Sequence, residues 1–292
     1  MPRALEPSIN ERDFVLQALQ ENIRIDGRSF NDFRRVQLTF GNQPGIADVK
    51  LGSTRVIAYI SAEITQPFSD RKFDGIFNIT TEISPMASPT FESGRQTEQE
   101  TILSRILEKA IRRSNALDTE SLCIIAGQKC WSVSVDVHVL DYDGGLIDAS
   151  CIAVISALLH FRRPDVSVVG EEVTVFTLTE RVPVPLSMLH HPLCVTLSFF
   201  HDGAVVLVDA TLQEQQLSDG EMIVTANKYG EICQIAKLGG VPTDALTLLN
   251  CIEVAMRKVV ELDKVIASAF KQDNKQHNYD IIEKELRAEN ER

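Results

Sequence analysis

The sequence lacks the features that mark several large classes of protein. Its six cysteines form no CxxC pair, which argues against a disulfide framework and against a zinc site built on cysteine. No apolar run approaches the roughly 18 residues that span a bilayer. Residues 1–13 carry charges where a signal peptide has an apolar core. We therefore expect an intracellular protein of the nucleus or cytoplasm, with reduced cysteines and no membrane partner.

Positive charge is scarce as well. The chain has 29 Lys and Arg against 41 Asp and Glu, a formal charge of -12. A protein that coats nucleic acid needs dense Lys and Arg to displace counterions, so the composition argues against that class. It leaves room for one local basic surface. The phosphate-binding motifs GxxxxGK[ST] and GxGxxG and the nucleophile motif GxSxG do not occur.

What is present is a chain of 292 residues, 44% hydrophobic, that twice runs through strands before helices. The patterns predict strands at 36–40, 48–50, 54–60 and 131–140, hairpins at 193–209 and 221–235, and helices at 8–22, 97–114, 149–160 and 243–270. Ser8 with Glu11 and Thr97 with Glu100 predict the N-terminal caps of the first two helices. The alternate valines from Val133 to Val139 predict one buried face of the strand 131–140. This order indicates an α+β protein of two lobes, each a mixed sheet packed by helices.

The expected organisation has five parts. An N-terminal helix (1–22) precedes a first domain (23–165), and a segment of linker and edge strands (166–190) leads to a second domain (191–270). A polar tail (271–292), with little apolar surface, predicts a frayed helix or a disordered extension.

The helix predicted at 97–114 carries a concentration of basic residues. Its spacing puts apolar side chains on one side and a group of cations on the other, namely Arg105, Lys109, Arg112 and Arg113, with Arg95 just before the helix. A solvated helix face explains such a group by default. The arginine content favours a phosphate-binding surface, because a planar guanidinium suits phosphate better than an ammonium does. Four further arginines could extend this surface: Arg24, Arg28, Arg34 and Arg35.

Metal chemistry has weaker support. Four aspartates (Asp136, Asp141, Asp143 and Asp148) surround a Gly-Gly turn and could in principle hold Mg²⁺. Turn and helix-cap chemistry explains the aspartate before the Gly-Gly turn better, and Asp136 belongs to the polar face of a strand. The pair His190 and His191 lacks the i, i+4 spacing of a helical metal site. We predict no metal and no cofactor.

Several segments, taken in order, resemble the RNase PH family. They are Arg24-Ile-Asp-Gly-Arg28 with Arg34-Arg35, residues 51–56, Gly94-Arg95 with the basic helix, and residues 141–149 around the Gly-Gly turn. The resemblance covers about 20–265 and implies a fold of two α+β lobes. Active members of that family degrade RNA from its 3′ end by phosphorolysis.

The resemblance also implies that this chain has lost that chemistry. Leu146 and Ile147 stand where active members carry a small hydroxyl or glycine residue and an arginine that bind phosphate. Gln215 and Glu221 stand at metal-binding carboxylate positions, and the neutral Gln215 leaves that pair incomplete. Arg95 and Arg105 match positions at which the family binds RNA.

Within the family, residues 82–92 and 208–214 are most similar to a ring subunit of the eukaryotic RNA exosome. This implies a hexameric ring in which the chain pairs with a catalytic-like neighbour as a heterodimer. RNA-binding cap subunits, a hydrolytic exonuclease subunit and single-stranded RNA are the other expected partners, in the nucleus with its nucleolus and in the cytoplasm. Two alternatives stay open: an active phosphate-dependent exoribonuclease, and an assembly module without RNA contact.

Overall fold

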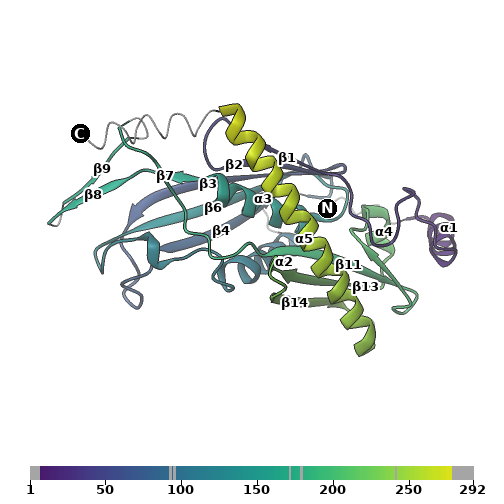
Figure 1. The fold of residues 1–292 in the computed structure, drawn as a ribbon. Helices are drawn as coiled ribbons and strands as arrows, with labels where there is room; N and C mark the ends of the chain where they lie inside the picture. Colours follow the sequence, from purple (N-terminus) through teal and green to yellow (C-terminus); the bar gives the residue numbers. More distant parts are fainter. Residues whose placement is uncertain are drawn as a thin grey trace.

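Two β-sheets organise the chain (Figure 1), in a computed structural model that describes residues 7–91, 94, 97–170, 172–177, 180–240 and 242–277. The first sheet has the order β1-β2-β3-β6-β4, with β5 also paired to β6. Only the β4–β6 pairing in it is parallel. Its strands are β1 (Val36–Phe40), β2 (Ile46–Leu51), β3 (Thr54–Thr65), β4 (Ile76–Ile83), β5 (Cys123–Ile125) and β6 (Lys129–Asp141).

The second sheet has the order β12-β11-β13-β14. Its strands are β11 (Leu193–Phe200), β12 (Val205–Val208), β13 (Gly220–Ala226) and β14 (Ile232–Gly239). The α+β class is confirmed, but this sheet is antiparallel throughout and not mixed as expected. The consecutive strands β11 and β12, and likewise β13 and β14, pair through short turns. Strands joined in this way are antiparallel, because parallel neighbours need a long crossover connection.

The segment between the sheets forms two small ladders. In it, β7 (Arg162–Arg163) pairs with β10 (Val184–Pro185), and β8 (Val166–Val169) pairs with β9 (Glu172–Val175). The β8–β9 hairpin projects away from the body of the molecule (Figure 1). It exposes the apolar side chains of Val168, Val169 and Val175.

Two helices begin at the caps that the sequence predicts. α1 (Ile9–Gln20) and α2 (Glu98–Leu107) each start with a complete capping box, Ser8 with Glu11 and Thr97 with Glu100. α2 continues as a π-helical turn (Glu108–Arg112), and a 3₁₀ turn follows at Glu120–Leu122. The other helices are α3 (Leu146–His160), α4 (Leu212–Leu217) and α5 (Ala245–His277).

One continuous core joins the two lobes. α3 is buried along almost its whole length and packs against β2 and β3 of the first sheet and β11 of the second. The four valines of β6 predicted to share a face, Val133 to Val139 in alternate positions, are all buried in this core. α5 also crosses both sheets (Figure 1). The lobes are therefore fixed to each other by α3 and α5.

The ends of the described chain bear on two expectations. Residues 271–277, the first part of the predicted tail, continue α5, and the rest of the tail lies outside the described residues. Among the helices of the described residues, none combines the length and the apolar character that crossing a bilayer requires.

Candidate functional site

The Gly-Gly turn before α3 lies at the junction of the two lobes. Gly144 and Gly145 have φ of 76° and 63°, in the left-handed region that favours glycine. A Cβ on Gly144 would come within 2.5 Å of the Ala210 carbonyl oxygen. The hydroxyl of Thr54 donates to the Gly144 carbonyl at 2.7 Å and holds the turn on the first sheet. No other residue fits this turn, which sets where α3 begins.

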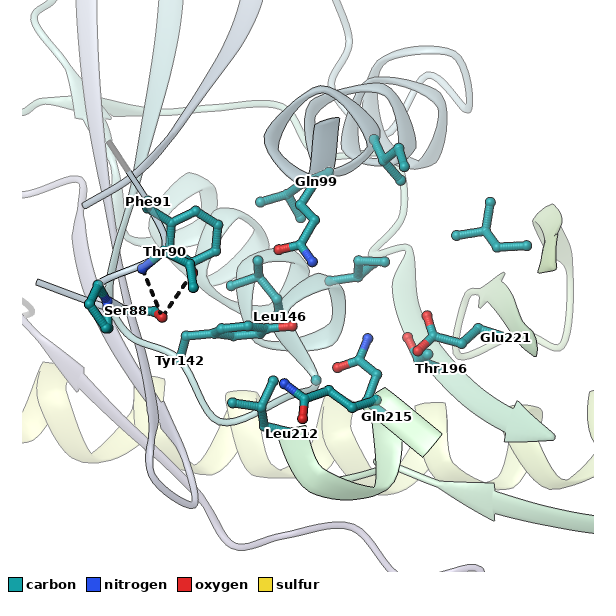
Figure 2. Close-up of a pocket in the computed structure, with 17 residues that line it drawn as sticks. Ser88, Thr90, Phe91, Gln99, Tyr142, Leu146, Thr196, Leu212, Gln215 and Glu221 are labelled. Atoms are coloured by element: carbon teal, nitrogen blue, oxygen red, sulfur yellow. Dashed lines mark hydrogen bonds between the residues drawn. The ribbon is translucent and has the colours of Figure 1, made fainter. Parts of the chain in front are cut away.

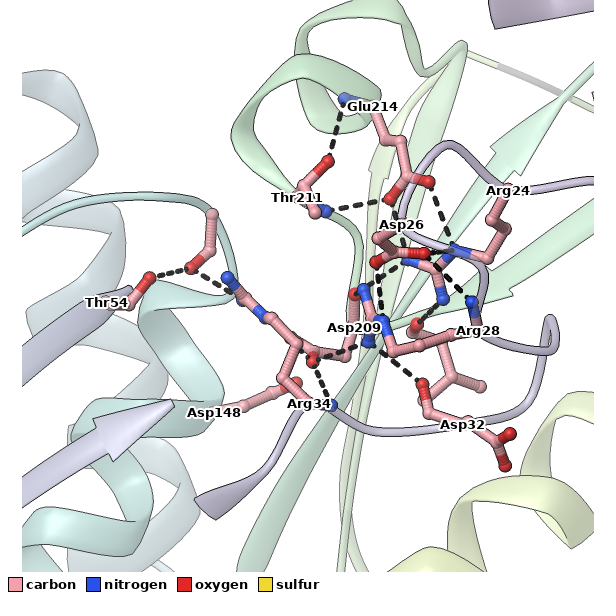
Figure 3. Close-up of polar contacts among 12 residues, drawn as sticks. Arg24, Asp26, Arg28, Asp32, Arg34, Thr54, Asp148, Asp209, Thr211 and Glu214 are labelled. Atoms are coloured by element: carbon pink, nitrogen blue, oxygen red, sulfur yellow. Dashed lines mark hydrogen bonds and ion pairs between the residues drawn. The ribbon is translucent and has the colours of Figure 1, made fainter. Parts of the chain in front are cut away.

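A buried ion pair closes over the same turn (Figure 3). Asp209, which is fully buried, accepts hydrogen bonds from Arg34 through Nε at 2.9 Å, Nη2 at 2.7 Å and the backbone N–H at 2.8 Å. Arg34 also donates to the carbonyls of Asp143, at 2.6 Å, and Gly144, at 3.0 Å. Burial alone would lower the pKa of Arg34, and Asp209 more than offsets this, so that pKa is raised. Arg34 thus links the N-terminal segment, the Gly-Gly turn and the second lobe.

Arg24 and Arg28 extend this buried network. Arg24 is 2% exposed and binds Glu214 with two hydrogen bonds, Nε to Oε1 at 3.0 Å and Nη2 to Oε2 at 2.7 Å. It also donates to the carbonyls of Val208 and Asp209. Arg28 donates to the Asp209 carboxylate at 3.1 Å. Each guanidinium is satisfied by groups of the protein itself.

These positions correct the expectation that the N-terminal arginines extend the basic surface. Arg34 was expected to contact RNA, but its donors are used inside the protein and its side chain is 8% exposed. Arg24 and Arg28 likewise donate to carboxylates of the second lobe, Glu214 and Asp209. Arg35, next to Arg34 in sequence, is exposed. The family-like segment 24–35 therefore connects the lobes and leaves Arg35 alone as a surface candidate from this group.

Asp148, one of the four aspartates around the Gly-Gly turn, is buried in the first turn of α3. Gly145 is the N-cap residue of α3 and makes no side-chain cap. Asp148 points into the second lobe, where it accepts hydrogen bonds from the backbone N–H of Thr196 at 2.9 Å and from its hydroxyl at 2.7 Å. Burial raises the pKa of Asp148 to about 8, and the bonds from Thr196 oppose that rise.

Asp148 is expected to make stability depend on pH. Its folded pKa of about 8 lies above the ordinary 3.8, so the folded protein keeps a proton that the unfolded chain releases. This contribution is fully present below about pH 4 and is lost as pH rises through about 8. From about pH 6 to about pH 7.5, the free energy of unfolding of Asp148→Asn should gain about 2 kcal/mol on the wild type. Urea denaturation of both proteins at each pH measures this, and parallel pH profiles would refute it.

A pocket of about 510 Å³ lies between α2, the start of α3 and the second sheet (Figure 2). All four positions that the resemblance marks as degenerate, Leu146, Ile147, Gln215 and Glu221, line it. The other lining residues are Ser88, Pro89, Thr90, Phe91, Gln99, Ile102, Leu103, Tyr142, Gly145, Thr196, Leu212, Gln216 and Leu238. The structure therefore brings together the four degenerate positions, of which Leu146 and Glu221 are 75 positions apart in sequence.

The electrostatics of this pocket are unsuited to phosphate. Among the described residues that line it there is no Lys, Arg or His. Burial raises the pKa of Tyr142 to about 12, which keeps the phenol neutral. Burial also raises the pKa of Glu221, and a side-chain hydrogen bond from Gln215 partly offsets this. A phosphate dianion would meet a carboxyl and apolar walls without a countercharge.

The pocket does not fit a divalent metal either. Of its two candidate ligands, Gln215 is neutral, and Glu221 is the only carboxyl among the described lining residues, so the pair of carboxylates is incomplete. Within the described parts of the chain, no three His, Cys, Asp or Glu residues lie together in a way that could hold a metal ion. His190 and His191 instead face Cys233 and Asp263, at 3.8 and 3.2 Å.

The basic face predicted on the helix 97–114 lies at the surface. It runs from α2 through the π-helical turn to Arg113 and is called the α2 surface below. Arg105, Lys109, Arg112 and Arg113 are all exposed. Arg112 pairs with Glu108 at 3.5 Å, whereas Arg105, Lys109 and Arg113 make no ion pair with any residue that the structure describes. The π-helical turn carries Lys109 and Arg112. Arg95 lies outside the described residues.

The acidic residue Glu100, in the first turn of α2, faces inward. Glu100 is 8% exposed and accepts hydrogen bonds from the backbone N–H groups of Ile83 and Thr97, both at 3.2 Å. The inner side of the same helix gives Gln99, Ile102 and Leu103 to the pocket. α2 thus separates an apolar pocket from a cationic surface.

Sequence reasoning missed Asp209 and Glu214 as partners of the N-terminal arginines. These pairs join residues 175 and 190 positions apart, a separation that no spacing rule covers. A signal was present in the sequence, because the apolar run Val205–Val208 is followed directly by the charged residue Asp209. A carboxylate at such a position predicts a buried partner, without identifying it.

Both lobes of this chain match the models of a known protein family. Residues 32–164 match the model of the 3′ exoribonuclease family, domain 1, and residues 190–258 match domain 2. An exosome complex component rrp45 of Schizosaccharomyces pombe is 54% identical over 273 residues, covering 94% of each chain. The exosome complex component RRP45 of Saccharomyces cerevisiae is 48% identical, covering 95% of each. The human protein of that name is 44% identical over 91% of this chain and 60% of its own.

Solved structures agree with the sequence matches. A chain of the Archaeoglobus fulgidus exosome with RNA bound to the active site superposes with a TM-score of 0.75 and 32% identity, covering 87% of this chain and 97% of that one. A chain of an archaeal exosome core gives a TM-score of 0.72 and 29% identity, with 88% and 96% covered. The chain therefore belongs to the 3′ exoribonuclease family, the RNase PH family.

Proposed function

We propose that this chain is a non-catalytic RNase PH-like ring subunit of the RNA exosome. In this role it scaffolds the hexameric core and helps to bind and thread single-stranded RNA for 3′-to-5′ degradation and processing of rRNA, mRNA and other RNAs. Support comes from relatives up to 54% identical that are named exosome complex components, and from the fold shared with archaeal exosome cores.

The observation that carries the loss of catalysis is the lining of the 510 Å³ pocket. Phosphorolysis needs donors that hold a phosphate dianion and charge that stabilises the leaving oxygen. Leu146 and Ile147 have no donor in their side chains, and Gln215 supplies no charge. An active phosphorolytic enzyme is therefore the less favoured alternative.

Retained RNA contact is supported by the α2 surface. Arg105, Lys109 and Arg113 are exposed and unpaired among the described residues, so their donors are available to a phosphate backbone. Contacts of this kind follow a single strand without reading its sequence. This observation favours the RNA-threading role over an assembly module without RNA contact.

The proposal includes partners and location. The chain pairs with a catalytic-like RNase PH neighbour, and the ring carries RNA-binding cap subunits and a hydrolytic exonuclease subunit. Such a subunit works in the nucleus, including the nucleolus, and in the cytoplasm. The total charge of -12 suits it, because only one edge needs to be basic.

A phosphorolysis assay tests the catalytic part. The full chain, alone and with its ring neighbour, is incubated with 3′-labelled single-stranded RNA, phosphate and Mg²⁺, and nucleoside diphosphates are separated by chromatography. We expect no product from the isolated chain above the blank without phosphate. Any phosphorolysis by this chain together with its ring neighbour should be unchanged when Gln215→Ala is introduced into this chain. An active RNase PH protein serves as the positive control, and phosphate-dependent product from the isolated chain would overturn the proposal.

A further inference from the structure

The pocket beside α2 has an excess of hydrogen-bond acceptors for which the described chain supplies no cation. Glu221 makes no ion pair with a described residue, and its one polar partner is the Gln215 amide. The Gln215 Oε1 atom is itself buried and has no hydrogen-bond partner among the described residues. Figure 2 shows the ends of the Gln215 and Glu221 side chains turned toward each other. Glu221 is thus a carboxyl that the described chain leaves without a cation in a largely apolar pocket, and this favours a ligand that brings donors and a positive charge.

We propose that this pocket binds the side chain of an arginine presented by a partner protein. The guanidinium would donate to the two oxygens of the Glu221 carboxylate, and a turn of the Gln215 side chain would bring its Oε1 atom, enclosed in the empty pocket, to a third N–H. Five N–H groups in a fixed fork match a carboxylate with a neighbouring carbonyl oxygen better than the single ammonium of lysine does.

The walls of the pocket suit the rest of an arginine. Leu146, Ile147, Leu212 and Leu238 supply apolar surface for the three methylene groups of the stem. Phe91 and Tyr142 stand edge to face, with ring centroids 6.0 Å apart, and offer aromatic surface on which a guanidinium can stack. The volume of about 510 Å³ lies in the range of small-ligand sites and has room for the backbone on either side of the arginine.

Other ligand classes fit less well. An anion would be repelled by Glu221 and would find no cation among the described lining residues. An uncharged nucleobase could stack on Phe91 or Tyr142, but it would leave the carboxylate without a countercharge in a largely apolar site. Burial raises the pKa of Glu221, and a bound guanidinium would reverse this by favouring the charged form.

The inference uses the pocket on which the proposed function rests, but the two can fail separately. Phosphate-dependent release of nucleoside diphosphates would contradict the proposed function. Failure to bind arginine would contradict only the present inference. If both hold, the pocket that the resemblance aligns with the phosphate site of active relatives serves here to recognise a ring neighbour or an associated factor.

A pair of matched probes tests it without any mutation. Nα-acetyl-arginine-N-methylamide and the corresponding citrulline amide have the same shape, and only the first is charged. Binding to the full chain is followed by NMR chemical-shift changes of pocket residues and by calorimetry. We expect saturable binding of the arginine probe and binding of the citrulline probe weaker on the order of 30-fold, because a buried charge pair is lost.

Two variants locate the effect. Glu221→Gln should bring the arginine probe down to the affinity of the citrulline probe. Glu63→Gln, at an exposed glutamate of β3 with no ion pair in the described chain, should keep the discrimination. Equal affinity of the two probes for the wild type would overturn the proposal. So would the absence of saturable arginine binding, or displacement of the arginine probe by uridine or inorganic phosphate.

Discussion

Replacing Asp209 with asparagine is expected to lower the free energy of unfolding by about 3–5 kcal/mol. The substitution keeps the size of the side chain and removes its charge. Arg34, whose Nε, Nη2 and backbone N–H all donate to this carboxylate, would be left as a buried cation without a full partner. Arg28 would lose its ion pair with the same group, 3.1 Å away. Because these contacts join the N-terminal segment to the second lobe, the loss should affect the whole cooperative unit.

The chain offers a close control in Asp202. It shares the left-handed backbone, with φ of 54° against 50° for Asp209, so both positions tolerate asparagine equally. Asp202 is exposed and has no ion pair with a described residue, so Asp202→Asn should change stability by less than about 0.5 kcal/mol. Urea denaturation followed by circular dichroism measures both variants. Equal midpoints for the two would mean that the Arg34–Asp209 pair does not hold the lobes together.

Local structure followed from the sequence wherever local rules decide it. Ser8 with Glu11 and Thr97 with Glu100 predicted the first turns of α1 and α2, because a capping box satisfies backbone groups within four residues. The alternation of Val133 to Val139 predicted which face of β6 is buried, since side chains alternate along a strand. The start of α3 was placed three residues late, at Ala149, because left-handed Gly145 takes the place of a capping side chain.

Long-range electrostatics could not be predicted in the same way. Arg34 looked like a surface cation because it lies in a polar segment with Arg35, yet one is buried and the other exposed. The difference depends on Asp209, and only the folded chain brings the two together. The hydrogen bonds of Asp148 could not be predicted for the same reason, since Thr196 is 48 residues away.

The candidate site also has a part that long-range folding decides and a part that local periodicity decides. The resemblance to RNase PH proteins singled out Leu146, Ile147, Gln215 and Glu221, and the structure brings all four to one pocket. Their spacing alone gave no sign of this, because they come from the start of α3, from α4 and from β13. The basic face of α2 needed only helical periodicity, and its four cations are exposed as predicted. Their role in RNA binding stays a prediction.

Removing three cations from that face is expected to weaken RNA binding by the assembled ring on the order of 100-fold at about 0.1 M salt. The variant combines Arg105→Ala, Lys109→Ala and Arg113→Ala, the three cations without an ion pair in the described chain. Each phosphate contact on a single strand contributes about 0.7 to the slope of log affinity against log salt, so three lost contacts flatten it by about 2. All three side chains are exposed, so the fold should be unaffected.

A second triple variant controls for the change in net charge. Arg257, Lys264 and Lys271 are exposed on α5, and their replacement with alanine removes the same charge from another helix. Binding by this control should change by less than about threefold, because long-range attraction is screened beyond about 10 Å at 0.1 M salt. Ring assembly of both variants is verified by size-exclusion chromatography before RNA is added.

The salt dependence of RNA binding tests most directly the central claim that this subunit holds RNA through the α2 surface. Affinity for an unstructured single strand is measured by fluorescence anisotropy over a series of salt concentrations, for rings with the wild type, the α2 variant and the α5 control. We predict a slope flatter by about 2 for the α2 variant alone. Identical slopes for all three rings would contradict the claim and leave the chain a module of assembly only.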